Sequence, residues 1–427
     1  MNIPFSANQI KENIMYFLRV LSVILIFSFS LIYLSCDIIT ETGSTVTGKV
    51  YSYEHIPVSN VRVTCGNQSV KTSEDGSFTI NDLTYPYDLI VSDSLYGYAT
   101  IFKGLSTGNV SLPLKNTGFI SGQFINIHVK IPFRIFQPNT EGKIYFTDGN
   151  YMSSYSEISK YDTGAALELY TSEPVEGKLI LLTYKKDNSG KIVSYENFGE
   201  SKSLEFHPGV MNNYRFDSTD ISLNPGEQTV TGSFQYPPGS YTSYANFYLN
   251  FSAKNSFSYA RICEIGSNIF NFIIPTGLPS EYTAHIKNDS YGGTSGYSSE
   301  DFIVYPDIPN RPEVKQAPAI ISPGNNITIV NNNTEFSFTE GTGSGIYIVS
   351  LYNRNKNVMY RIVTSNTSFT LAQLEGMGFG RINNNAFYWD VVKTGPVSSM
   401  NDYVTDFFNK GTNFSSGTAT MEFLTEP

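Results

Sequence analysis

The sequence is poor in cysteine, histidine and tryptophan. Its 427 residues include three cysteines, four histidines and one tryptophan. The cysteines, Cys36, Cys65 and Cys263, are too far apart to form the framework of a small disulfide-stabilised protein. We expect Cys65 and Cys263, which lie among strand-forming residues, to be small buried hydrophobic side chains rather than redox or metal-binding groups.

The residue patterns of common catalytic and metal sites are also missing. The histidines, His55, His128, His207 and His285, are widely separated and form no His-x-x-x-His spacing, so no zinc site is predicted. The sequence contains no Gly-x-Ser-x-Gly elbow, glycine-rich phosphate loop or EF-hand series. We therefore expect no metal, no cofactor and no catalytic residue.

Basic residues are outnumbered by acidic ones. The chain has 28 Lys and Arg against 38 Asp and Glu, which gives a formal net charge of -10. The basic residues are scattered singly instead of forming a stripe that could displace counterions from a phosphate backbone. Nucleic acid is therefore not expected as a partner.

Helical periodicity of apolar residues is nearly absent from the mature chain. The chain is instead rich in Tyr, Phe, Thr, Ser, Asn and Gly, which favours an all-β fold. A β-sandwich needs roughly 100 residues, so the length predicts several domains. The expected architecture is a tandem array of immunoglobulin-like or transthyretin-like β-sandwiches after an N-terminal signal peptide.

The N-terminus has the pattern of an export signal. Lys11 and Arg19 precede the apolar run 20–34, which is followed by Ser35 and Cys36. The run is short for a membrane span of about 20 residues. No basic cluster follows it, so a permanent membrane helix is the less favoured alternative.

The ending Leu34-Ser35-Cys36 resembles the lipobox of bacterial lipoproteins, although Tyr33 stands where that motif usually has leucine. The resemblance implies a signal peptide over 1–35, a lipidated (palmitate-bearing) Cys36 and a polar tether over 36–45. Several acyl chains give stable anchoring where one does not. We therefore expect a membrane partner through this lipid and a location in the bacterial cell envelope, at the outer membrane, with the periplasmic and surface faces both open. An unmodified cysteine after an ordinary secretory signal is the alternative.

Residues 46–115 read as a small β-sandwich. Gly48-x-Val50, Val61-x-Val63, Asp75-Gly76-x-Phe78 and Tyr87-x-Leu89-x-Val91 resemble the carboxypeptidase regulatory-like domain. That resemblance implies a transthyretin-like sandwich of seven strands with no chemistry of its own. Asp75-Gly76 predicts a tight turn with positive φ. The zinc ligands of the peptidase half of that enzyme family are not seen.

Residues 117–226 and 228–307 predict two further β-sandwiches. Strand-like runs are separated by turn clusters at the spacing typical of sandwiches. A Thr/Ser-Gly pair between apolar residues recurs at 47–50, 121–124 and 231–234. This weak repeat indicates tandem related modules.

A proline-rich joint over 305–312 predicts stiff, extended chain between domains. Beyond it, residues 313–427 form the last expected sandwich. Phe336-x-Phe338, the run 345–351 and the run 386–392 resemble a fibronectin type III-like domain, with Phe338 where that family often has tryptophan.

Tyrosines set among Ser, Gly, Thr and Asn are the candidate ligand-binding residues. Tyrosine supplies large contact area at low entropic cost, as in antibody loops. The alternative is that a Tyr-rich composition produces such clusters by itself. The candidates, all expected in loops, are Tyr151, Tyr155, Tyr241, Tyr244, Tyr291 and Tyr297.

The predicted function is a non-catalytic, lipid-anchored envelope protein that displays β-sandwich modules for adhesion or protein assembly, with an unidentified protein or glycan partner. One alternative is a carbohydrate-binding accessory lipoprotein of a polysaccharide uptake system, which tyrosines gathered into a flat platform would favour. The other is an unrecognised hydrolase, which would need acidic or histidine side chains brought together between modules.

Overall fold

The computed structural model describes residues 43–425 except 54, 94–96, 115–122, 133–138, 150–152, 159–161, 172, 251–258, 265–267, 280–281, 293–295, 325–327, 354–358, 373–385 and 411–413. The chain divides into two compact units, Met1–Ser44 and Thr45–Pro427. The apolar run 20–34 and Cys36 lie outside the described residues. The described chain is all-β apart from short helices, as the composition predicts.

The four predicted sandwich ranges, 46–115, 117–226, 228–307 and 313–427, are called the first, second, third and last spans. The first span contains the seven strands expected there. They form a three-stranded sheet, β4-β1-β7, facing the run β3-β2-β5-β6 of a larger sheet. Inward side chains such as Val46 and Val50 alternate with outward ones, as a strand with one buried face requires. Gly76 has the predicted positive φ, 75°. The strands are β1 (Ser44–Ser52), β2 (Arg62–Cys65), β3 (Gln68–Lys71), β4 (Ser77–Leu83), β5 (Tyr87–Asp93), β6 (Tyr98–Leu105) and β7 (Asn109–Leu114).

The second span forms the sheet β10-β9-β12-β13-β16, to which β14 is joined through β12, and the sheet β11-β8-β15. In β12, Leu179 and Leu181 face one hydrophobic cluster, while Ile180 and Leu182 face another. This double burial explains the unbroken apolar run there. The elements are β8 (Gln123–Lys130), β9 (Thr140–Thr147), β10 (Ser153–Ile158), β11 (Gly164–Thr171), β12 (Val175–Lys186), β13 (Ile192–Glu200), β14 (Leu204–Phe206), β15 (Met211–Arg215), the 3-10 helix η1 (Ser218–Asp220) and β16 (Ile221–Leu223).

The third span pairs the sheet β20-β17-β23 with the run β19-β18-β21-β22 of the large sheet. Phe234, Phe247 and Phe270 are buried in the hydrophobic cluster between them, which β12 also joins. The strands are β17 (Glu227–Ser233), β18 (Ser240–Asn250), β19 (Tyr259–Glu264), β20 (Ile269–Pro275), β21 (Thr283–Gly292), β22 (Gly296–Ile303) and β23 (Pro309–Asn310).

The last span packs the sheet β24-β26-β29 against the run β31-β30-β27-β28, with β32 paired to β30 and β25 paired to β32. Trp389 is fully buried there and meets Phe336 edge to face, with ring centroids 5.1 Å apart. The elements are β24 (Ile320–Ser322), β25 (Thr328–Val330), β26 (Glu335–Phe338), β27 (Ile346–Asn353), β28 (Met359–Thr364), β29 (Ser368–Thr370), β30 (Ala386–Gly395), α3 (Met400–Lys410), β31 (Phe414–Gly417) and β32 (Met421–Thr425).

Each of the four spans has an early strand paired in parallel with a late one: β1 with β7, β8 with β15, β17 with β23, and β25 with β32. Gly48 lies opposite Val110, and Gly232 lies opposite Asn310. A Cβ atom on Gly48 would come within 2.5 Å of the Val110 carbonyl oxygen, and one on Gly232 within 2.3 Å of the Asn310 oxygen. The repeated Thr/Ser-Gly pair therefore marks a close approach of two backbones. Its third copy, the pair Ser121-Gly122, lies outside the described residues.

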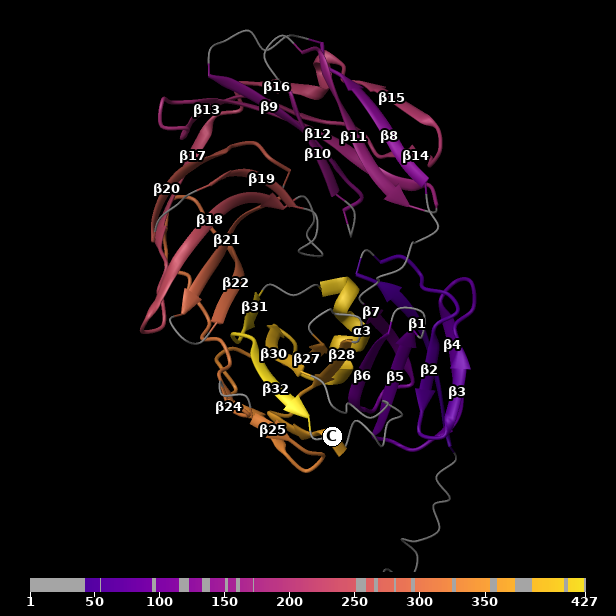
Figure 1. Ribbon diagram of the computed structural model, residues 1–427. Helices are drawn as coiled ribbons and strands as arrows, with labels where there is room; N and C mark the ends of the chain where they lie inside the picture. Colours follow the sequence, from indigo (N-terminus) through magenta and orange to yellow (C-terminus); the bar gives the residue numbers. More distant parts are fainter. Residues whose placement is uncertain are drawn as a thin grey trace, which may run out of the picture. The chain divides into compact units, whose positions relative to one another are not determined.

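Strands of different spans share one 14-stranded sheet (Figure 1). The strand β22 pairs with β31, and β6 pairs in parallel with β28. The helix α3 packs beside β6 and β7, where Met400, Tyr403 and Val404 enter the hydrophobic cluster of the first span. The spans therefore share both hydrogen bonds and hydrophobic packing.

The proline-rich joint is bound to the third span rather than running free. Asn310, 8% exposed, donates from Nδ2 to the carbonyl oxygens of Thr231, Tyr305 and Ile308, at 2.9 to 3.0 Å. Its Oδ1 accepts a hydrogen bond from the Tyr305 amide. The Asn310 side chain supplies hydrogen-bond donors that the neighbouring prolines lack, because proline has no amide hydrogen.

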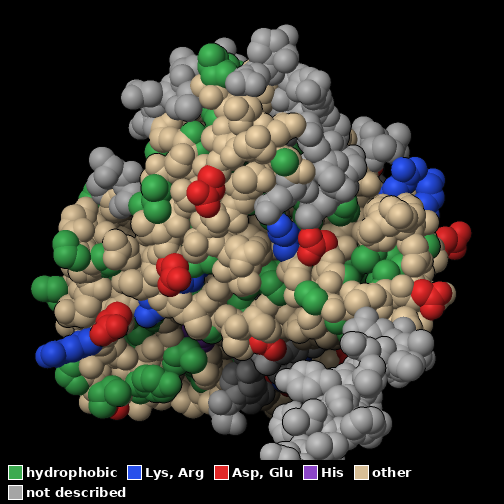
Figure 2. Space-filling model, turned by 90° about the horizontal axis from the view of Figure 1, so that it is seen from below, with side chains coloured by type: hydrophobic (Ala, Val, Ile, Leu, Met, Phe, Trp, Pro, Cys, Tyr) green, Lys and Arg blue, Asp and Glu red, His purple; other side chains and the backbone are tan. Residues whose placement is uncertain are grey.

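Charged side chains are dispersed on one face of the molecule. On the face drawn in Figure 2, acidic and basic side chains lie singly or in small groups among polar and apolar ones. This face shows the scattered charge that the sequence predicts.

Candidate functional site

The candidate tyrosines that the structure describes lie on strands, not in loops. Tyr155 is in β10, Tyr241 and Tyr244 are in β18, Tyr291 is in β21 and Tyr297 is in β22. Small polar neighbours suggested loops, but outward tyrosines that alternate with inward side chains also have the period of a strand. Tyr151 lies outside the described residues.

Tyr241, Tyr291 and Tyr297 form a line across three neighbouring strands. Tyr241 lies directly opposite Tyr291, and Tyr291 lies directly opposite Tyr297. Side chains of directly opposed residues project from the same face of a sheet. Their exposed fractions are 58%, 48% and 38%, so each ring is in solvent over much of its surface. We call these three residues the tyrosine row.

Tyr244 and Asp289 extend this face by one pair. They lie opposite each other on β18 and β21, after a register shift between Thr242 and Tyr244. The Tyr244 hydroxyl is hydrogen-bonded to the Asp289 carboxylate, which raises the pKa of the phenol. A carboxylate acceptor and an exposed ring therefore lie beside the row.

Small side chains on β31 let the Tyr297 ring lie close to the sheet. Gly417 is opposite Tyr297, and a Cβ on Gly417 would be 2.8 Å from the ring. The Tyr297 hydroxyl is hydrogen-bonded to the side chain of Ser415. The glycine thus provides space that a larger residue would fill with its own side chain.

The same face continues onto the last span, where sequence reasoning missed two tyrosines. Tyr388 of β30 and Tyr352 of β27 lie opposite each other and stack, with centroids 5.9 Å apart. Burial raises the pKa of both Tyr297 and Tyr352, and the charge of Asp390 raises both further. Asp390 therefore lies between the row and this second pair. Only the pairing of β22, β31, β30 and β27 reveals the connection.

Tyr155 is separate from the row. It lies on another sheet, opposite Tyr145, with ring centroids 6.1 Å apart and Lys143 Nζ 5.3 Å from its own centroid. The Tyr145 hydroxyl donates to the backbone oxygen of Arg261 at 3.2 Å, which ties this corner to β19. Tyr155 thus lies near the sheet that carries the tyrosine row but is not part of the row.

A hydrogen-bonded trio of a hydroxyl, an imidazole and a carboxylate, from Thr283, His285 and Asp301, has the connectivity of a hydrolase triad. His285 Nε2 is 2.7 Å from Thr283 Oγ1, and His285 Nδ1 is 2.8 Å from Asp301 Oδ2. The side chains of His285 and Asp301 are only 7% and 9% exposed. All three residues lie on β21 and β22, within one span rather than between modules.

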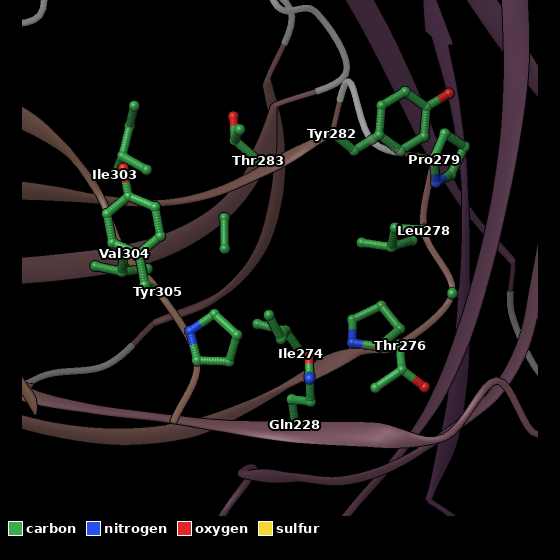
Figure 3. Close-up of a pocket in the computed structure, with 14 residues that line it drawn as sticks. Gln228, Ile274, Thr276, Leu278, Pro279, Tyr282, Thr283, Ile303, Val304 and Tyr305 are labelled. Carbon is green, nitrogen blue, oxygen red and sulfur yellow. The ribbon is translucent and has the colours of Figure 1, made fainter. Parts of the chain in front are cut away.

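The position of Thr283 argues against a nucleophilic role. A cavity of about 300 Å³ lies beside it, lined also by Ile274, Leu278, Tyr282 and Tyr305. Figure 3 shows the Thr283 hydroxyl pointing away from the space that these side chains surround. Because the Thr283 hydroxyl is held by the buried imidazole and points away from the cavity, we assign this hydrogen-bonded trio a structural role.

Within the described residues, no group of three or more His, Cys, Asp and Glu side chains is placed to hold a metal ion. Cys65 is a buried free thiol, as predicted, and burial raises its pKa. The side chain of Cys263 is outside the described part. In that same part of the chain, no helix has the length and apolarity to span a membrane.

No protein-family model and no curated protein matches the sequence. Similar solved structures include a leucine-rich repeat protein from Bacteroides thetaiotaomicron, at 14% identity and TM-score 0.18, over 45% of this chain and 26% of that one. Fibronectin domains FN1 to FN3 of chicken CNTN1 match at 8% identity and TM-score 0.16, over 80% and 94%. A tetra-tandem repeat of a large adhesion protein matches at 11% and 0.14, over 89% and 99%.

The chain thus spans about a quarter of the leucine-rich repeat protein. The assignment of residues 46–115 to the carboxypeptidase regulatory-like family stays a prediction, since no family model matches. A functional assignment therefore depends on the chain's own surface.

Proposed function

We propose that this chain is a non-catalytic, lipid-anchored protein of the bacterial cell envelope that uses its β-sandwich surface for adhesion or assembly. Its anchor is the acylated Cys36, and the tether predicted over 36–45 is shortened to 36–43, because the first strand begins at Ser44. The tyrosine row is its contact surface. The protein works by presenting this surface to a partner, not by chemistry on it.

The observation that supports the proposal best is the convergence of Tyr241, Tyr291 and Tyr297 on one face. Tyr241 and Tyr291 are 50 residues apart in the sequence, Tyr291 and Tyr297 are six apart, and strand pairing aligns the three exposed rings. Aromatic rings dominate the binding energy of many protein surfaces. In the trio of Thr283, His285 and Asp301, by contrast, the hydroxyl is held by the imidazole and points away from the neighbouring cavity.

Anchoring is tested by comparing wild type with Cys36→Ala after production in a bacterium. Intact mass should show acyl chains on wild type only, and detergent phase separation should retain wild type only. Protease added to intact cells then separates surface display, in which the protein is cut, from periplasmic display, in which it is protected. Soluble and unacylated wild type would contradict the anchor and leave a freely secreted binding protein.

A further inference from the structure

We propose that the tyrosine row binds a neutral polysaccharide, with one glycan chain lying along Tyr241, Tyr291 and Tyr297 and thus across the strands. The inference rests on the proposed function and names the ligand class of that contact surface.

The spacing of the rings suits a repeating ligand. Neighbouring strands lie about 4.8 Å apart, so a row across them presents one ring per strand. The Tyr241 and Tyr291 centroids are 6.5 Å apart and their planes differ by 33°. Successive sugar units of an extended glycan have a comparable repeat, and the C–H faces of pyranose rings pack on aromatic rings. The rings of Tyr241 and Tyr291 therefore suit neighbouring sugars, and Tyr297 lies one strand further along the row.

The polar groups beside the row suit hydroxyl-rich and uncharged ligands. Asp289 lies next to Tyr291 on the same face of β21, and Asp390 lies beyond Tyr297 on β30. Carboxylates accept strong hydrogen bonds from hydroxyl groups, whereas they repel anionic sugars. The tyrosine hydroxyls can donate as well as accept. Neutral glycans are therefore favoured over uronic-acid polymers.

The shape of the face favours a glycan chain over a protein. Anchor residues of protein interfaces fill well-packed pockets that exclude water. Next to Tyr297, the residues that share its face are the small Ser299 on β22 and the small Ser415 and Gly417 on β31. The Tyr297 ring therefore stands beside a shallow strip that leads toward Tyr388. A chain ligand can follow this strip without a pocket.

The test is affinity electrophoresis of the full-length protein in gels that contain xyloglucan, galactomannan, laminarin or dextran, with alginate and polygalacturonate as anionic counterparts. The variants are Tyr241→Ala/Tyr291→Ala and Tyr241→Phe/Tyr291→Phe. Tyr170→Ala, an exposed tyrosine on β11, is the matched control. Circular dichroism and thermal unfolding check that each variant folds.

Wild type should be retarded by at least one neutral polysaccharide and not by the anionic ones. The alanine pair should weaken binding roughly tenfold, because two stacking contacts are lost. The phenylalanine pair should retain most of the affinity, and Tyr170→Ala should match wild type. No retardation by any neutral polysaccharide, retardation by the anionic ones alone, or equal retardation of the alanine pair would overturn the proposal.

Failure of this inference differs from failure of the proposed function. If Cys36 is acylated and the protein is displayed, yet no polysaccharide is bound, the anchored display stands and a protein becomes the partner. If Cys36 is unmodified but the alanine pair loses glycan binding, the ligand class stands and the anchor falls.

Discussion

The His55 imidazole stacks on the Tyr51 ring, with centroids 4.4 Å apart and planes 13° from parallel. Burial lowers its pKa from 6.5 to about 4. Between these values the unfolded chain binds a proton that the folded chain does not. Stability is therefore fully present above pH 6.5 and decreases as the pH falls toward 4.

The pH dependence predicts a specific effect of His55→Asn. Asparagine tolerates the positive φ of 59° at this position. The variant loses the ring stack at every pH. It has no imidazole that takes up a proton on unfolding, so its unfolding free energy should fall between pH 7 and pH 5 by about 1 kcal/mol less than that of wild type. Urea unfolding at both pH values measures the difference. Equal losses in the two proteins would show that His55 does not titrate as described.

His285 predicts a second effect at the residue scale. His285→Ala removes a hydrogen-bonding partner from the buried Asp301 carboxyl, and we expect a loss of about 2–4 kcal/mol in unfolding free energy. His207→Ala is the control, because His207 and Glu205 are exposed and 3.9 Å apart, and it should cost under about 0.5 kcal/mol. Similar values for both, measured by chemical denaturation, would show that the buried trio has no structural role.

At the scale of elements, the missing side chain of Gly232 allows β17 to pair closely with β23. Gly232→Ala would place a Cβ 2.3 Å from the Asn310 oxygen and from the Phe270 ring. We expect a loss of about 2 kcal/mol or more, since neither the paired backbone nor the buried ring can yield without disturbing the core. Gly324→Ala has nothing within 4 Å and should leave the melting temperature unchanged. A Gly232→Ala melting curve that overlays wild type would contradict the close approach.

Local patterns predicted the strands but not which of them meet. The turn at Asp75-Gly76 and the double-sided burial of β12 follow from neighbouring residues, so the sequence could reveal the turn and the apolar strand. The alignment of Tyr241 with Tyr291 depends on register across the sheet, including a shift near Tyr244, and no local pattern specifies it. The five candidate tyrosines within the described residues are exposed, but they were expected in loops, and the alignment of Tyr241, Tyr291 and Tyr297 on one face was not predicted.

At the scale of the molecule, α3 couples the two ends of the described chain. Tyr403, 1% exposed, packs with Val46, Val110 and Leu112 in one hydrophobic cluster. Tyr403→Ala should therefore lower the unfolding free energy by about 3–5 kcal/mol. The amides of β1 and β7 should also lose protection from hydrogen exchange.

Tyr305→Ala, at a site 56% exposed, is the control for this change and should leave exchange in β1 and β7 as in wild type. Faster exchange confined to α3 in the Tyr403→Ala protein would mean that the first span folds without the helix. Faster exchange in β1 and β7 would mean that the first and last spans form one cooperative unit.

The measurement that tests the central claim most directly is retention of bacteria on surfaces coated in parallel with xyloglucan, galactomannan, laminarin and dextran, with intact cells where added protease cuts the protein and opened cells where it does not. The strains carry wild type, Cys36→Ala, Tyr241→Ala/Tyr291→Ala or Tyr170→Ala at equal protein levels. We predict retention for wild type and Tyr170→Ala, and loss of retention for Cys36→Ala and for the tyrosine pair. Cells with the tyrosine pair replaced that adhere as well as wild type would contradict the claim that an anchored tyrosine row is the contact surface.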